Sequence, residues 1–72
     1  MTTQIEKLAE AISVVGTQAE LARQINCSQV FVHQMLRGLR SIPARFCLPI
    51  EQATNGAVTR YELRPDVFGP AP

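Results

Sequence analysis

A repeated start signal for helices is the feature that most constrains this chain. The pattern Thr-x-x-Glu occurs three times within 72 residues, at Thr3 with Glu6, Thr17 with Glu20, and Thr59 with Glu62. In such a capping box the threonine hydroxyl accepts a hydrogen bond from the third helical N–H, and the glutamate accepts one from the N–H of the threonine. Each box lies beside apolar residues at three- and four-residue steps, which predicts an all-α fold of short helices.

Residues that tolerate a positive φ angle divide the chain further. Gly16, Asn26 and Gly38 each follow a periodic stretch and predict where a helix ends. We therefore expect a compact bundle of about five short helices, at about 4–15, 18–25, 29–37, 43–53 and 60–64. The third helix is expected to bury a short list of side chains: Val32, Met35 or Leu36, and Leu39 just past its end.

Prolines mark the later boundaries. Pro43 suits the first turn of the fourth helix, whereas Pro49 lies inside it and predicts a kink or break near residues 45–46. Pro65 stops the fifth helix, and residues 65–72 are typical of a tail. The expected organisation is one domain over residues 1–64 followed by this tail.

The length of the chain limits its function. A domain of 72 residues hides only about 60% of its unfolded surface, and this sequence has no nucleophile, base and acid set. We expect no enzyme, no cofactor and no small-molecule substrate. No apolar stretch approaches the ~20 residues that span a bilayer, and the N-terminal residues lack the order of a signal peptide. These features predict a cytoplasmic protein with no membrane partner.

The two cysteines and the single histidine do not form a metal-site pattern. Cys27 and Cys47 lie twenty positions apart with His33 between them, so no CxxC pair exists. We expect both cysteines to be reduced and in the core, although their number alone leaves a disulfide open. His33 has no acid near it in sequence, which makes it a groove-facing or plain exposed side chain rather than a catalytic base.

Charge is distributed unevenly along the chain. The window from Leu21 to Ile50 contains no Asp or Glu and carries +4, while the whole chain carries +1. Its basic residues are Arg23, Arg37, Arg40 and Arg45. Such a window could bind a polyanion, although an acid-free stretch of this length also occurs by chance.

Two short helices joined by a three-residue turn are the arrangement of a helix-turn-helix, and the spacing here meets three physical demands. Ala22 supplies a small residue where the helices cross. Asn26, four residues later, accepts the positive φ of the turn. Val32, six residues further on, returns an apolar side chain to the crossing. Residues 18–25 and 28–37 therefore predict this motif.

Residues 18–38, QAELARQINCSQVFVHQMLRG, resemble the phage Cro and repressor class of helix-turn-helix proteins. Their continuation, from IPARFCLPIEQAT to VTRYELRPD, is similar to the YdaS-like branch of that class. Two positions depart from the pattern, since Asn26 replaces the usual glycine of the turn and Met35 stands where the branch tends to have tryptophan. The resemblance implies a prophage regulator of Cro type, or an antitoxin, since both roles are described in this branch.

The geometry of a docked helix-turn-helix nominates the residues that read bases. The N-terminal part of the second helix of the motif enters the major groove, so side chains at its start and one turn later face the bases. This selects Ser28, Gln29, Val30, His33, Gln34 and Arg37. A glutamine can contact adenine at two points, an arginine can read guanine or hold a phosphate, and a valine can touch a thymine methyl. Outside such a motif, the glutamines would be ordinary solvated amides.

Contacts to the DNA backbone are expected from residues around this helix. Arg40 and Arg45 follow it and would lie near phosphates, where their contribution would be independent of sequence and sensitive to salt. The resemblance adds that Gln18 holds a phosphate and braces Gln29. Phe31 lies off the core stripe, so it could pack under the fourth helix, touch a thymine, or contact a partner protein.

One copy of such a domain makes few contacts, which favours a homodimer on two half-sites about 34 to 36 Å apart. The expected dimer surface is the C-terminal apolar set: Tyr61, Leu63, Val67 and Phe68. The alternative is that these side chains complete the core of their own chain.

Together these features predict a regulator of transcription that binds double-stranded DNA and most simply represses by occupying a short palindromic operator. Direct contact with polymerase, and so activation, is left open. The competing prediction is an antitoxin or protein-interaction module that binds a toxin, with DNA binding secondary.

Overall fold

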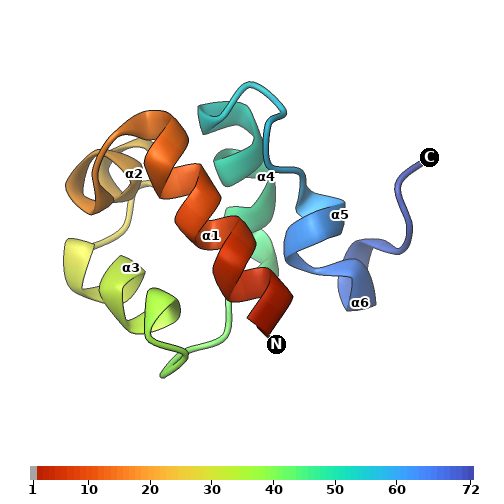
Figure 1. Ribbon diagram of the computed structural model, residues 1–72, viewed down its shortest axis with the longest axis horizontal. Helices are drawn as coiled ribbons and strands as arrows, with labels where there is room; N and C mark the ends of the chain where they lie inside the picture. Colours follow the sequence, from red (N-terminus) through yellow and green to blue (C-terminus); the bar gives the residue numbers. More distant parts are fainter. Residues whose placement is uncertain (1) are drawn as a thin grey trace.

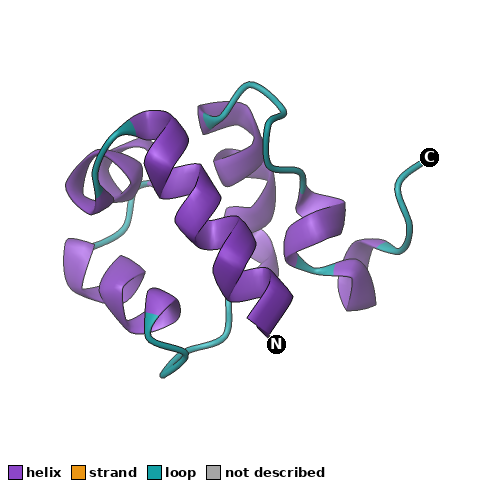
Figure 2. Cartoon of the chain, in the orientation of Figure 1, coloured by secondary structure: helices purple, strands orange, loops and turns teal. Residues whose placement is uncertain are grey.

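The computed structural model describes residues 2–72 and is all-helical over that range (Figures 1 and 2). Its elements are α1 (Thr2–Val15), α2 (Gln18–Ile25), α3 (Gln29–Leu36), α4 (Ala44–Ala53), α5 (Arg60–Leu63) and α6 (Pro65–Phe68). The prediction of a small helical bundle is confirmed, with six helices in place of about five. Met1, the first residue of the predicted domain, lies outside the described residues.

Two of the three predicted N-terminal signals cap a helix. The hydroxyl of Thr17 accepts a hydrogen bond from the Glu20 N–H at 3.0 Å, and α2 starts after it. Thr59 and Glu62 form the complete reciprocal box at the start of α5. The box at Thr3 is wrong, because α1 already begins at Thr2 and Thr3 lies inside the helix.

The ends of α2 and α3 use the same device. Asn26 has φ 60° and ψ 51°, and the N–H groups of residues 26 and 27 return to the carbonyls of Arg23 and Ala22. Gly38 has φ +76°, and the N–H groups of residues 38 and 39 return to the carbonyls of Met35 and Gln34. Both are Schellman motifs, in which one left-handed residue satisfies two carbonyls at the end of a helix. The predicted stops are confirmed.

The core draws on every long helix. Side chains that are buried or nearly so come from α1 to α5 and from the connecting loops: Leu8, Ala11, Leu21, Ala22, Ile25, Val32, Met35, Ile42, Cys47, Ile50, Val58 and Leu63. The predicted inward positions Val32 and Met35 are confirmed, and Leu36 is half-buried. Leu39 is a wrong prediction, because its side chain is 74% exposed.

Pro49 does not break α4. The helix runs unbroken from Ala44 to Ala53, so the predicted break near residues 45–46 is absent. A proline removes one hydrogen bond of the helix and crowds the preceding turn. Cys47 and Ile50, on either side of Pro49, are completely buried, and their packing holds the helix across the defect.

Residues 65–68 form a helix within the segment that is predicted as a tail. Pro65 occupies the first position of α6, and α6 packs against α5 (Figure 1). Helix α5 in turn contacts α1 and α4. Arg64 connects this end to the rest of the chain, since its guanidinium donates to the carboxylate of Asp66 at 2.8 and 3.0 Å and to the carbonyl of Ile42 at 2.7 Å. Pro65 could be recognised in the sequence, whereas the hydrogen bonds of Arg64, which we call the Arg64 clamp, could not be predicted from it.

Within residues 2–72, no helix combines the length and the apolar character that crossing a bilayer requires.

Candidate nucleic-acid interface

The helix pair α2–α3 has the geometry of a helix-turn-helix. The helices pack on each other, and α2 also packs on α4 (Figure 1). Ala22 and Val32, the residues predicted to meet at the crossing, are both buried in the core. The left-handed Asn26 turns the chain between them. This places the start of α3 beside the start of α2, on one edge of the molecule.

Ser28 fixes the first turn of α3. Its hydroxyl accepts a hydrogen bond from the N–H of Phe31 at 3.1 Å, which leaves the hydroxyl proton free to donate elsewhere. The side chain stays exposed although it caps the helix. Ser28 therefore caps α3 and still presents its hydroxyl to the solvent.

The residues nominated to read bases lie together on α3. Gln29, Val30, His33 and Arg37 are exposed, with Val30 65% accessible, and Gln34 is half-buried. Because a helix turns once in 3.6 residues, positions 29, 30, 33 and 37 share one side of it. Four side chains, Gln18, Gln29, Val30 and His33, line a single shallow depression. The N-terminal ends of α2 and α3 thus form one continuous surface.

The implied brace between Gln18 and Gln29 is not made in this state. The two residues share the depression, yet none of the hydrogen bonds of the described residues joins them. Both amides are therefore available to an incoming ligand. The brace stays a prediction for the bound state.

Arg23 does not add a free charge to this surface. Its guanidinium binds the Glu20 carboxylate through Nε at 3.1 Å and through Nη2, and Gln24 donates to the same carboxylate. The hydrogen bond from Arg23 lowers the pKa of Glu20, which keeps the pair ionised. The spacing of three residues on a helix is the sequence signal for this pair.

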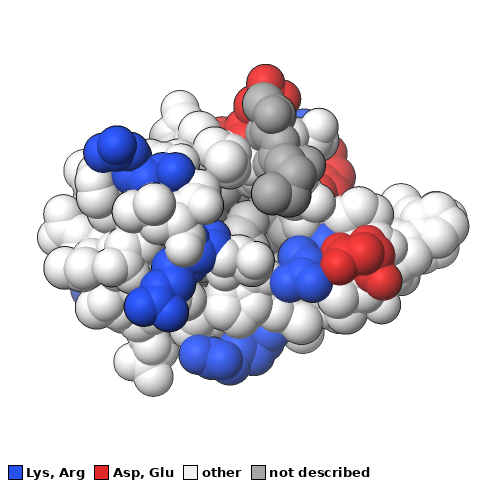
Figure 3. Space-filling view, turned by 90° about the horizontal axis from the view of Figure 1, so that it is seen from below, with Lys and Arg blue, Asp and Glu red and all other residues white. Residues whose placement is uncertain are grey.

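The other three arginines of the acid-free window stay unpaired with acids. Among the described residues, Arg37, Arg40 and Arg45 form no ion pair with Asp or Glu, and all three are exposed. Figure 3 shows the face turned toward the loop after α3, where basic side chains on the α2–α3 side have no acidic neighbour. The acidic side chains of this view lie toward α1 and the C-terminal helices. This separation provides a local positive surface despite the small net charge.

Phe31 packs inside the molecule rather than on this surface. Its ring meets that of Phe46 edge-on, with centroids 5.7 Å apart and planes at 61°. The guanidinium carbon of Arg45 lies over the ring of Phe46, 4.8 Å from its centroid. Of the three alternatives for Phe31, the structure therefore supports packing under the fourth helix. The same contact holds Arg45 near α3.

The predicted dimer surface is largely used within the chain. Leu63 is completely buried, so its assignment to a free surface is wrong, and Phe68 is half-buried against the core. Tyr61 accepts a hydrogen bond from Arg60 at 2.8 Å and lies under its guanidinium. Val67 alone of the four is substantially open, at 49%. The C-terminal segment completes the monomer core to a greater extent than predicted.

Neither cysteine forms a disulfide. Cys47 is buried and Cys27 half-buried, and burial raises the pKa of both thiols. A raised thiol pKa means little nucleophilic thiolate at neutral pH. Over residues 2–72 no three His, Cys, Asp or Glu side chains gather in a way that could hold a metal ion.

Similarity to known proteins extends over most of the chain. A family model described as "Bacterial toxin YdaS" matches residues 8–72. "Putative transcriptional regulator YdaS" of Escherichia coli (strain K12) is 45% identical over 58 residues, which are 81% of this chain and 59% of that relative. The chain thus spans 59% of the length of the curated relative, and no solved structure matches it. With almost its whole length matched, the chain belongs to the YdaS family.

Proposed function

We propose that this chain binds double-stranded DNA in a sequence-specific manner and regulates transcription. The observation that carries the proposal is the exposed side of α3, where amide, apolar and imidazole groups share one depression with Gln18. Farther along the helix, the exposed guanidinium of Arg37 forms no ion pair with a described acid. A major groove is wide enough to admit one α-helix, and it presents donors, acceptors and thymine methyls. The description of the relative as a transcriptional regulator supports the same function.

Base reading falls to the exposed residues of α3. Gln29, in its first turn, is suited to a two-point contact with adenine, and Val30 to the methyl group of thymine. His33 lies one turn later, and Arg37 lies at the end of the helix, where it can reach guanine or a phosphate. Ser28 can donate its hydroxyl proton. Gln34, which is half-buried, offers a smaller part of its amide.

Backbone contacts are proposed for three side chains around that helix: Gln18, Arg40 and Arg45. Gln18 stands at the first position of α2, where the N–H groups of a helix start favour a phosphate. Arg40, in the loop after α3, and Arg45, in the first turn of α4, add positive charge. Each phosphate that a cation neutralises releases counterions, so these contacts make the affinity depend on salt.

Repression of Cro type is the mode that we favour. The described helices offer a surface for DNA contacts at the start of α2 and along α3. A protein of this kind acts by occupying its operator, without chemistry or a cofactor. Two copies on a palindromic site would supply the affinity that one helix cannot.

The direct test is selection of bound sequences from a random duplex pool by the purified chain. We expect a short palindromic motif, and Gln29→Ala should accept two or more bases equally at one position of each half-site. Each lost two-point contact removes about 1–3 kcal/mol of discrimination. Gln52→Ala on α4 is the matched control, an exposed glutamine outside the α2–α3 pair, and should select the same motif as the parent. Recovery of no motif would overturn the proposal.

A second function, binding to a partner protein, is favoured by the open apolar side chain of Val30. The description of the family as a toxin names a member of a protein pair, although it names the toxin rather than the antitoxin. Under this alternative the chain is an antitoxin or interaction module, and α3 meets a protein surface. Salt separates the two functions. Affinity for a duplex should fall steeply as salt rises, whereas an apolar protein contact should depend on salt only weakly.

A further inference from the structure

Leu39 is an apolar side chain held away from its own chain. It occupies the second residue after the cap of α3, where a Schellman motif usually packs an apolar side chain on the last turn of the helix. Here the residue facing it is Gln34, whose carbonyl accepts the Leu39 N–H at 2.9 Å, and the leucine stays 74% exposed. Two hydrogen bonds and the left-handed Gly38 fix this position. The loop therefore displays a fixed apolar knob.

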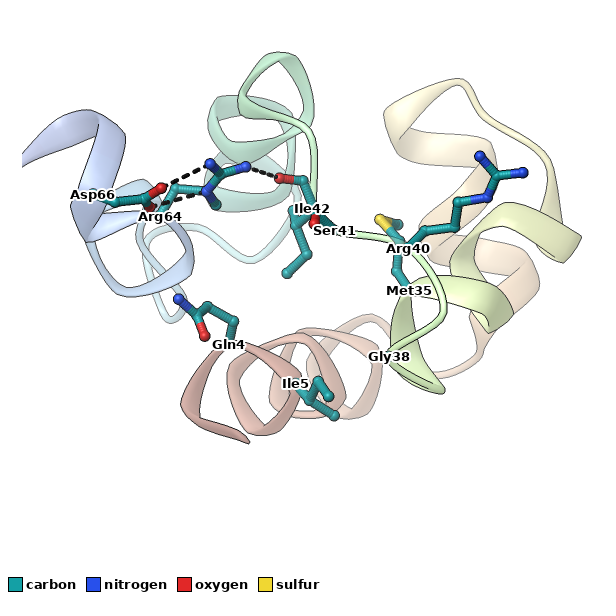
Figure 4. A pocket seen from close by; sticks show the side chains of 9 residues that line it. All are labelled: Gln4, Ile5, Met35, Gly38, Arg40, Ser41, Ile42, Arg64 and Asp66. Carbon is teal, nitrogen blue, oxygen red and sulfur yellow. Dashed lines mark hydrogen bonds and ion pairs between the residues drawn. The ribbon is translucent and has the colours of Figure 1, made fainter. Parts of the chain in front are cut away.

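A cavity opens directly beside that knob. It measures about 190 Å³ and lies between α1, the loop after α3, and the start of α6 (Figure 4). Gly38 and Arg40, the neighbours of Leu39, line it, whereas Leu39 does not. Ile5, Met35 and Ile42 supply its apolar walls. Since a water occupies about 30 Å³ of liquid, the cavity has ample room for the four-carbon side chain of one leucine.

Two arginines line the cavity, and Arg40, which forms no ion pair among the described residues, extends away from the other lining side chains (Figure 4). The guanidinium of Arg64 donates hydrogen bonds to the Asp66 carboxylate and to the Ile42 carbonyl, as Figure 4 shows. An ion pair with these extra hydrogen bonds presents less unsatisfied charge than a lone arginine would. The cavity therefore suits an apolar group better than an anion.

We propose that Leu39 of one copy enters this cavity of a second copy, and that the partner's Leu39 enters the first. Leu39 lies in the loop that forms one wall of the cavity, so a single patch of the surface carries both the inserting side chain and its receptor, as pairing about a twofold axis requires. This pairing deepens the proposed function, because it names the surface through which two copies meet on DNA. It is an alternative to the C-terminal set, in which Leu63 and Phe68 serve the monomer core.

The spacing of this pair agrees with a DNA target. The eight residues of α3 span about 12 Å, and the link to Leu39 adds a few Å more, so Leu39 lies about 15–20 Å from the reading end. Two copies that meet at Leu39, with their α3 helices pointing in opposite directions along one line, place their reading ends about 30–40 Å apart. One turn of DNA separates half-sites by about 34–36 Å.

The area of contact predicts when the pair forms. One loop entering one cavity, twice, covers much less than the 1,200–2,000 Å² that a stable complex buries. The free chain should accordingly be a monomer at micromolar concentration and should pair when DNA holds two copies together.

The first experiment needs no DNA. Methyl NMR spectra of the free chain, recorded from about 50 µM toward the millimolar range, should show concentration-dependent shifts of Ile5 and Ile42, the cavity walls. Leu39→Gln should abolish these shifts. Val67→Gln, which alters the exposed apolar residue of α6, should leave them unchanged. Absent shifts in the parent chain, or loss of the shifts in Val67→Gln alone, would overturn the pairing even if DNA binding is real.

The second experiment uses a duplex from the selection, intact or cut to one half-site. Leu39→Gln should lower cooperativity on the intact duplex at least about tenfold, since burying a leucine is worth more than a factor of ten, and half-site affinity should stay within about twofold. Unchanged cooperativity would refute the proposal while leaving the proposed function standing. If no duplex is bound at all, the proposed function fails and the NMR arm alone decides the pairing.

Discussion

Arg64 donates a hydrogen bond to the carbonyl of Ile42, 22 residues earlier, across 2.7 Å. This contact joins the C-terminal helices to the loop that carries Leu39 and Arg40 away from α3. Asp66 aligns the guanidinium through two further bonds and keeps it ionised, and the same bonds hold the pKa of Asp66 below its ordinary value. The C-terminal segment thus stabilises the loop beside the proposed DNA surface.

Removal of this clamp should cost stability. Arg64→Ala leaves the Ile42 carbonyl and the Asp66 carboxylate without their partner, and we expect a loss of about 1–3 kcal/mol in the free energy of unfolding. Urea unfolding followed by circular dichroism measures the loss. Arg40→Ala, an exposed arginine with no ion pair and no aromatic contact among the described residues, is the control and should change stability by less than about 0.5 kcal/mol. Equal stability of the two variants would mean that the clamp contributes nothing.

The left-handed turn of the motif should prefer glycine to any branched side chain. Asn26 has φ 60°, a conformation that costs an ordinary L-residue about 1–2 kcal/mol. Asn26→Gly should match or exceed the thermal stability of the parent, whereas Asn26→Val should lower it by several degrees. If Asn26→Val were as stable as Asn26→Gly, the turn in solution would differ from the one described.

Alanine substitutions at Leu63 and Val67 should have very different effects on the free energy of unfolding. Leu63 is completely buried, so Leu63→Ala should cost about 2–5 kcal/mol, enough to unfold much of a domain this small. Val67→Ala, four residues later and half exposed, should change stability by less than about 0.5 kcal/mol. Denaturant midpoints of the two variants make the comparison. A small effect at Leu63 would restore it as a candidate for a free surface.

The capping box of α5 should make the free energy of unfolding decrease at low pH. Hydrogen bonding from the Thr59 backbone, followed by that from Lys7, holds the pKa of Glu62 below its ordinary value. A carboxyl with a lowered folded pKa adds stability above its unfolded pKa and loses it as pH falls through the folded value. Unfolding between pH 7 and pH 3 should therefore show a steeper loss in the parent than in Glu62→Gln. Parallel pH profiles would show that the box does not titrate with folding.

Local signals predicted most of the fold. The bounds of α2 and the end of α1 follow from Thr17, Gly16 and Asn26, because caps and left-handed residues act within one helical turn. The crossing of α2 and α3 also follows from sequence, since a small residue and an apolar return at fixed spacing suffice to specify it.

Contacts between distant residues account for the failures. The helix at residues 65–68 depends on a bond from Arg64 to Ile42, and the continuity of α4 through Pro49 depends on burial against other helices. No local sequence pattern predicts the Arg64–Ile42 hydrogen bond or the packing of α4. The exposure of Leu39 likewise follows from the direction of a loop rather than from its own apolar character. The pairing of Arg23 with Glu20 was visible as a three-residue spacing, and it reduces the free positive charge near α3.

The central claim is that α3 and its arginines bind DNA, and the dependence of duplex affinity on salt tests it most directly. With Arg37, Arg40 and Arg45 on phosphates or bases, the logarithm of the binding constant should fall with the logarithm of salt concentration at a slope of up to about −2.7 for each bound copy. Arg45→Ala should make that slope shallower by about 0.9, whereas Arg23→Ala, whose charge Glu20 already compensates, should change it little. A slope near zero between 50 and 200 mM salt, identical in all three proteins, would contradict the account.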